Sequence, residues 1–234
     1  MNIKWNLITA MCLIAASATA FADDNWQGAL SQMPLGANVM ELNRTNCVPL
    51  MLGAFQSNGV VKALVFMPGA TDELYFFRRA HATLTNSNPS LLDAVTALTN
   101  QTYIQVTFNP PLLLLHTTED ALDGFATVKN ESTAAKLRGR IVRDRLVLND
   151  ADWGNLKSAL HRKLSVWLQP DPDAPETFHF YRHSFAACGV TQWELLETIA
   201  LAGKTTFMLH WLTADFQPDR RNGPAPDPKT ISVP

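Results

Sequence analysis

Apolar and polar positions follow two different periods along this chain, and the changes between them mark short predicted strands and helices. Leucine and valine recur at positions 91, 92, 95 and 98, the spacing of one helix face. Residues 102–108 instead alternate between polar and apolar, as a half-buried strand does. Patterns of this kind predict the order strand, helix, strand, strand, helix, strand over residues 37–42, 47–56, 60–66, 73–82, 89–100 and 102–108.

The second half of the chain repeats this order of elements. Thr191 and Glu194 form a capping box, which predicts a helix start, and Gly203 ends that helix. The predicted elements cover residues 140–148, 150–163, 164–169, 177–187, 191–203 and 205–212. Between the halves, residues 112–116 are a further candidate strand and residues 118–128 a candidate helix.

An internal repeat accompanies this order. A shift of 104 positions aligns residues 75–108 with 179–212 without a gap, and six of the 34 pairs are identical. The same order of elements in both halves and the aligned identical residues together predict two related modules.

The predicted fold class is α+β, with two tandem β-α-β-β-α-β modules. Each module is expected to be a sheet with helices on one face, which leaves the other face for solvent or for the other module. The predicted division is a leader at 1–22, a first module at 23–110, a connecting segment at 111–139, a second module at 140–214 and a proline-rich tail at 215–234.

The N-terminus has the features of a secretory signal peptide. Lys4 supplies a positive charge, residues 7–16 form a short apolar run, and Ala20-Phe21-Ala22 is a small-x-small cleavage pattern. The chain is therefore expected to be periplasmic or secreted after cleavage near Ala22. No later stretch reaches the roughly 18 apolar residues of a membrane-spanning helix, so no transmembrane segment is expected.

Composition narrows the class of protein. The chain has 234 residues, of which 47% are hydrophobic and 17% charged, as expected for a folded protein and not for a disordered one. Its net charge of −2 argues against binding to nucleic acid. Cys47 and Cys188 remain after cleavage, and in an oxidising compartment they could pair or stay as two separate thiols.

Residues 90–112 carry a resemblance to a known family. They read Ser-Leu-Leu-Asp-Ala-Val-Thr-Ala-Leu-Thr-Asn-Gln-Thr-Tyr-Ile-Gln-Val-Thr-Phe-Asn-Pro-Pro-Leu. This resembles the secretin and TonB short N-terminal domain (STN, N0-like). That family has a Leu-rich helix, a Gln-Thr-Gly turn and a strand that ends in an aromatic residue before Asp/Asn-Pro. Tyr103 occupies the position of the family's glycine, and residues 194–211 resemble the same unit more distantly.

The resemblance covers about a quarter of the chain that follows the leader. It implies a periplasmic, non-catalytic module that engages envelope proteins.

One metal-like spacing, His179-x-x-x-His183, falls on a predicted strand. There the two residues share a face but lie roughly 13 Å apart, too far for one ion. We therefore predict neither a metal nor a cofactor.

Aromatic and basic residues on the same predicted strand, together with their equivalents in the first half, form the candidate binding surface. Such a surface can stack bases, but export and negative charge favour a protein partner. The candidate residues are Tyr75, Phe77, Arg79, His81, His179, Tyr181 and His183.

These observations favour an exported, non-enzymatic protein-interaction module that acts on an envelope protein. Two alternatives stay open. A small-ligand-binding protein would place an aromatic or His-lined cleft between the modules. An enzyme would bring dispersed His, Asp and Cys residues together in space.

Overall fold

A computed structural model describes residues 26–67, 80–117, 127–128, 131–160, 163–164, 167–169, 182–203, 211–213 and 229–232. Helices and strands both occur in it, which confirms the α+β class. The helices are a segment at 26–31, α2 (Cys47–Ala54), α3 (Leu91–Gln101), α4 (Glu131–Gly139), α5 (Trp153–Leu160) and α6 (Gln192–Ala202).

The strands are short, with two to six residues each. In sequence order they are β1 (Glu41–Asn43), β2 (Ala63–Phe66), β3 (His81–Thr83), β4 (Gln105–Asn109), β5 (Leu112–His116), β6 (Thr127–Val128), β7 (Ile141–Val142), β8 (Leu146–Ala151), β9 (Trp167–Gln169), β10 (His183–Ala187), β11 (Val190–Thr191), β12 (Trp211–Thr213) and β13 (Lys229–Ser232).

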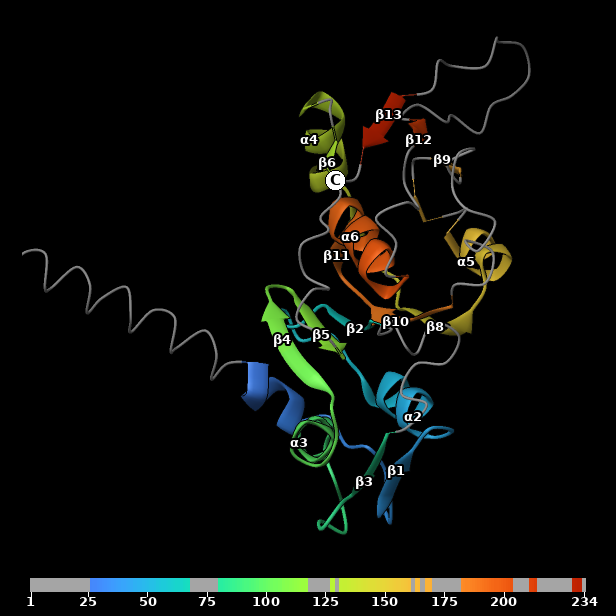
Figure 1. Cartoon of the computed structure of the whole chain (residues 1–234). Helices are drawn as coiled ribbons and strands as arrows, with labels where there is room; N and C mark the ends of the chain where they lie inside the picture. Colours follow the sequence, from blue (N-terminus) through green and yellow to red (C-terminus); the bar gives the residue numbers. More distant parts are fainter. Residues whose placement is uncertain are drawn as a thin grey trace, which may run out of the picture.

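Strands from both halves of the chain form one central sheet in the order β4-β5-β2-β10-β8 (Figure 1). The β2–β5 pair is parallel, and the other pairs are antiparallel. The tandem arrangement predicted a separate sheet for each half, whereas strands of both halves share this one. The two halves meet where β2 pairs with β10, over residues 63–66 and 184–187.

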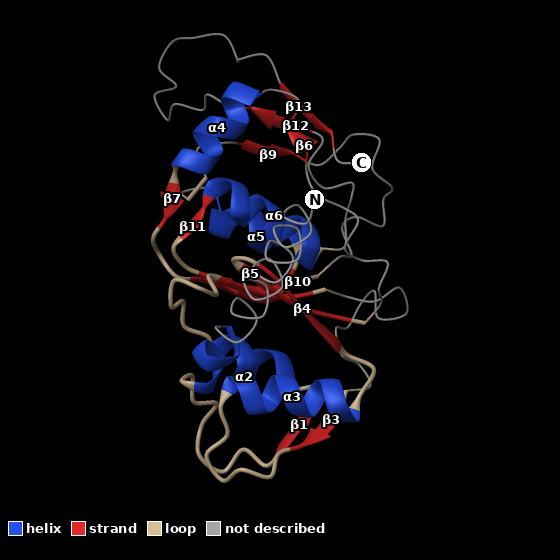
Figure 2. Ribbon diagram, turned by 90° about the vertical axis from the view of Figure 1, so that its left-hand side faces the viewer, coloured by secondary structure: helices blue, strands red, loops and turns tan. Residues whose placement is uncertain are grey.

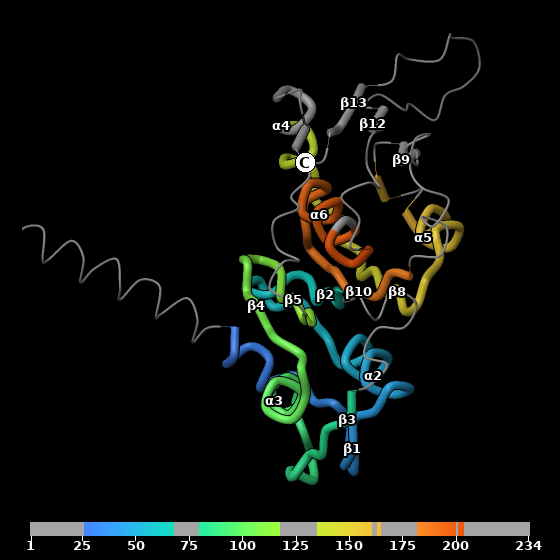
Figure 3. Tube along the Cα trace, in the orientation of Figure 1, coloured from blue at the N-terminus to red at the C-terminus, as the bar shows by residue number. Residues whose placement is uncertain are grey.

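Helices cover both faces of this sheet, and not one face as expected. Alternate residues of β2 point in opposite directions, so Leu64 and Phe66 pack with α2 and α3, whereas Ala63 and Val65 pack with α5 and α6. Figure 2 shows the helices α2 and α3 on one side of the sheet and α4, α5 and α6 on the other. The tube in Figure 3 shows that the first side comes from the first half of the chain and the second side from the second half.

The two long helices begin as the sequence predicts. Ser90 and Thr191 each accept a hydrogen bond from the backbone N–H of the third helical residue, and the carboxylates of Asp93 and Glu194 accept from the cap residues in return. The helices start at residues 91 and 192, a spacing of 192 − 91 = 101, which differs from the 104-residue shift of the repeat.

The remaining strands pair outside the central sheet, and here the predicted pairings were wrong. The strand predicted at 73–82 is described only as β3, which pairs with β1 and not with β2. The strand predicted at 140–148 is divided into β7, which pairs with β11, and β8 of the central sheet. The proline-rich tail contributes β13 to a second sheet with the order β6-β13-β12-β9.

Arg145 connects the two halves below the sheet. Its Nη2 donates to the carbonyl oxygens of Leu52, Gly53 and Phe55, at 2.8, 3.2 and 3.1 Å. These carbonyls lie at the end of α2, where the last peptide groups lack helical partners and the helix dipole is negative. A guanidinium from just before β8 therefore fixes α2 beneath the sheet.

Replacement of Arg145 by methionine should destabilise the fold. Methionine keeps the aliphatic stem but leaves three carbonyls without their charged donor, and we expect a loss of about 1–2 kcal/mol. Urea denaturation measures the change, and Arg143→Met, an exposed position on the same segment, is the matched control. Equal stability of the two variants would contradict this role of Arg145.

Candidate functional site

The central sheet places two buried histidines in one row with a methionine between them. Phe66 lies opposite Leu115 on β5 and Ser184 on β10, so the next residue, Met67, lies beside His116 and His183. His183 pairs with Ala151 on β8. All three side chains share the face that carries α5 and α6, because each lies two residues from a core residue of that face. Strand spacing puts the backbones of the two histidines about 10 Å apart.

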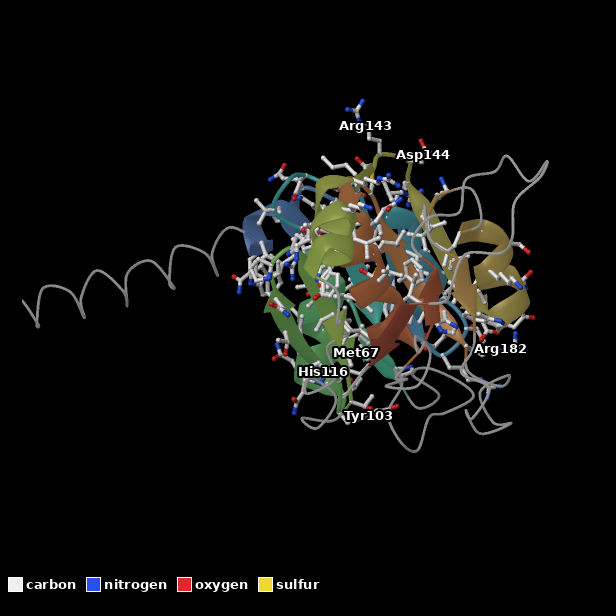
Figure 4. The ribbon with its side chains drawn as sticks, turned by 90° about the horizontal axis from the view of Figure 1, so that it is seen from above. Met67, Tyr103, His116, Arg143, Asp144 and Arg182 are labelled. Carbon is white, nitrogen blue, oxygen red and sulfur yellow. The ribbon has the colours of Figure 1, made fainter. Side chains whose placement is uncertain are left out.

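This row lies at the carboxyl ends of the parallel strands β2 and β5. The next helix described after β2 is α3, which packs on one face of the sheet, whereas the next helix described after β5 is α4, whose Leu137 packs on the other. Neighbouring parallel strands whose connections leave for opposite faces define a topological switch point, where open α/β sheets bind ligands. Figure 4 shows Met67 and His116 in the same part of the molecule, with Arg182 farther along this edge.

His183 is held as a neutral imidazole. Its side chain is buried, and burial lowers the pKa of His183 to about 4, although a contact with the Ala151 carbonyl opposes the shift. Nδ1 lies 3.3 Å from that oxygen. Because a carbonyl only accepts, Nδ1 donates, and Nε2 of the neutral ring is the acceptor.

His116 and the residue after it bring further polar atoms to the same edge. Nε2 of His116 lies 2.9 Å from Oγ1 of Thr107, on the neighbouring strand β4, and the imidazole is buried. Oγ1 of Thr117 is buried too, and within the described residues it has no hydrogen-bond partner. A buried hydroxyl without a partner costs about 1–3 kcal/mol.

The other polar groups at this edge organise the backbone. Arg182 donates to the carbonyl oxygen of Asp150 at 3.3 Å and lies 3.9 Å from the carboxylate of Asp152. Ser184 Oγ accepts from the N–H of Asp150 at 2.9 Å, where Asp150 has a positive φ of 50°. His183 and Ser184 point to opposite faces, so they do not form a base–nucleophile pair.

The predicted binding residues are not brought onto one described surface. His81 lies on β3, where its exposed side chain is 2.6 Å from Glu41, whereas His183 is buried in the central sheet. Tyr75, Phe77, Arg79, His179 and Tyr181 lie outside the described residues. His116 was missed, although a histidine that ends an uninterrupted run of four leucines was the available indication.

Cys47 and Cys188 are free thiols, which decides between the two alternatives against a disulfide. Cys47 is buried on α2, its Sγ is 3.9 Å from Sδ of Met51, and desolvation raises its pKa to about 12. Cys188 is half-buried and its Sγ donates to the carbonyl oxygen of Arg143 at 3.3 Å.

Among the described residues, no group of three His, Cys, Asp or Glu side chains is placed to hold a metal ion. Within the same residues, none of the helices is long and apolar enough to cross a membrane.

No family model matches the chain, and no curated protein or solved structure matches it. The resemblance to the STN domain therefore stays a prediction.

Acid should destabilise the fold through His183. Its pKa is about 4 when folded and about 6.5 when unfolded, so between these values the unfolded chain binds more protons. The stabilisation is complete above pH 6.5 and is lost as the pH falls towards 4, by up to about 3 kcal/mol. Urea denaturation across this range measures it.

Comparison with non-titrating variants isolates this contribution. His183→Gln should lose the part of the pH dependence that His183 supplies, and His81→Gln, at an exposed position, should retain it. An unchanged pH profile in His183→Gln would show that this imidazole is not held neutral.

The two thiols of the chain after Ala22 should differ in reactivity. Maleimide should modify Cys188 in the native protein, whereas Cys47 should react only after unfolding, because it is buried and its pKa is raised. Mass spectrometry of timed samples distinguishes the two sites. A native protein in which neither thiol reacts, before or after unfolding without reductant, would reveal a disulfide instead.

Proposed function

We propose that this chain is an exported, non-catalytic protein that binds a small polar ligand at the carboxyl edge of β2 and β5. The observation that carries the proposal is the row of His116, Met67 and His183 at the switch point of the central sheet. Export is supported by the charged, apolar and small-x-small pattern of residues 1–22.

The chemistry of this edge supports a polar ligand. The interior of the sheet is apolar, and buried polar side chains collect where β5 ends and β10 begins. His183 is neutral at pH 7, so it offers hydrogen bonding without charge. The hydroxyl of Thr117 is the kind of buried group that a ligand atom satisfies on binding.

A ligand at an edge fits the layers better than a partner on a sheet face. Both faces of the central sheet are covered by helices, and His183 is buried beneath one of these layers. An envelope protein as partner stays a prediction, and its surface would have to lie outside the central sheet.

The hydroxyl of Thr117 allows a direct test. Native mass spectrometry of the exported chain, purified without denaturant, should detect a bound small molecule. Thr117→Val keeps the shape of the side chain and removes the hydroxyl, so ligand occupancy should fall by about tenfold, while the ligand-free protein keeps or gains stability.

Thr83→Val, at an exposed position on β3, is the matched control and should leave occupancy unchanged. A wild-type chain that carries no small molecule, or equal losses in the two variants, would reject the proposal.

A further inference from the structure

A second surface, on the other side of the molecule from β1 and β3, combines positive charge with an exposed aliphatic side chain. It consists of Lys136 on α4, Arg140, Ile141 on β7 and Arg143, and we call it the β7 basic surface. All four residues are exposed, and Ile141 is 59% exposed, more than any other large hydrophobic residue among those described.

The cations of this surface pair with no acidic side chain among the described residues. Asp144 is the one acidic residue between positions 136 and 145, and it pairs with Lys163 at 2.9 Å. Arg138 lies over the ring of Trp193, 4.8 Å from its centroid, and Arg145 is bound to the end of α2. In the described part of the chain, Lys136, Arg140 and Arg143 form no ion pair.

The local charge opposes the charge of the whole chain. Residues 136–145 contain five cations and one anion, 5 − 1 = +4, whereas the chain carries −2, so the remainder carries −6. An anionic surface would therefore repel most of the molecule and attract this segment, which fixes the orientation of approach.

The geometry of β7 presents the surface outwards. Val142 is buried and Ile141 is exposed, so the ribbon turns one face to the core and the other to solvent. Figure 2 places β7 outside its partner β11, and Figure 4 shows Arg143 projecting from the molecule. Nothing in the described residues pairs with the free edge of β7.

We propose that the β7 basic surface docks on anionic phospholipid headgroups, with Ile141 inserted between them. Few residues suffice for such docking, because each cation near an anionic membrane contributes separately to the binding free energy. An exposed aliphatic side chain contributes further by its burial among the lipids. The surface holds a single exposed aliphatic residue, whereas the centre of a stable protein interface is largely apolar. The proposal is independent of the ligand site at the carboxyl edge of β2 and β5.

Vesicle co-sedimentation tests the docking. The chain from Asp23 to Pro234 retains every described residue and lacks the apolar leader. It should bind phosphatidylcholine vesicles that contain phosphatidylglycerol and not vesicles of phosphatidylcholine alone, and high salt should release it. Arg143→Gln should weaken binding about fivefold and Arg140→Gln with Arg143→Gln about 30-fold, at about 1 kcal/mol per cation.

Two further variants separate docking from general charge. Arg44→Gln removes the same charge from an exposed position near β1 and should bind as the wild type does. Ile141→Ser should weaken binding at every salt concentration, because insertion is not electrostatic. Circular dichroism checks that each variant is folded.

The opposite results would overturn the proposal. Equal binding by Arg143→Gln and Arg44→Gln would show that net charge alone is responsible. Binding to poly-glutamate without binding to the anionic vesicles would show that the surface takes an acidic protein instead. Binding to pure phosphatidylcholine would remove the role of the cations.

Discussion

The parallel strands β2 and β5 must be buried on both faces, and the rest of the structure follows from this constraint. Residues 63–66 and 112–115 are all buried, and none of these eight residues is polar. Each fully buried leucine of this pair contributes about 2 kcal/mol, provided that a layer covers it. One layer of helices can cover only one face.

The first half of the chain supplies α2 and α3 for one face, and the second half supplies α5 and α6 for the other. The two halves therefore need each other, and Arg145 reinforces this dependence by fixing α2 from the second half.

The same constraint explains where polar chemistry is found. A strand buried on both faces has no position for an imidazole in its middle, so polar side chains collect where the apolar run ends. His116 directly follows four leucines, and Met67 ends the apolar run of β2. The antiparallel strand β10 begins with His183 at the same level. The next helices that the structure describes, α3 and α4, then pack on opposite faces of the sheet. The site and the switch point are thus two consequences of one arrangement.

Local patterns in the sequence predicted elements well and pairings poorly. The helices α3 and α6 and the strand β5 were predicted closely, because caps and apolar spacing are encoded by neighbouring residues. The hairpin between β2 and the strand at 73–82 was not found, since β3 pairs with β1, and a choice of partner depends on distant residues. The leucine run of β5 did contain the information that overturns the one-face expectation: uninterrupted apolar strands are typical of sheets covered on both sides. His183 was selected as a binding residue on a sheet face and is buried, while the available indication of His116 was its position at the end of four leucines.

The internal similarity of the two halves has a physical explanation that requires no pair of separate sheets. Helices α3 and α6 share a capping box and an apolar face, yet they pack on opposite faces of one sheet. Their starts are 101 residues apart and not 104. The aligned strands also differ in role, since β3 belongs to an outer ribbon and β10 to the central sheet. A sheet that is apolar on both faces needs an amphipathic helix with a firm start on each side. Similar local sequences in the two halves satisfy that need, because both faces of the sheet are apolar and β5 presents leucines on each.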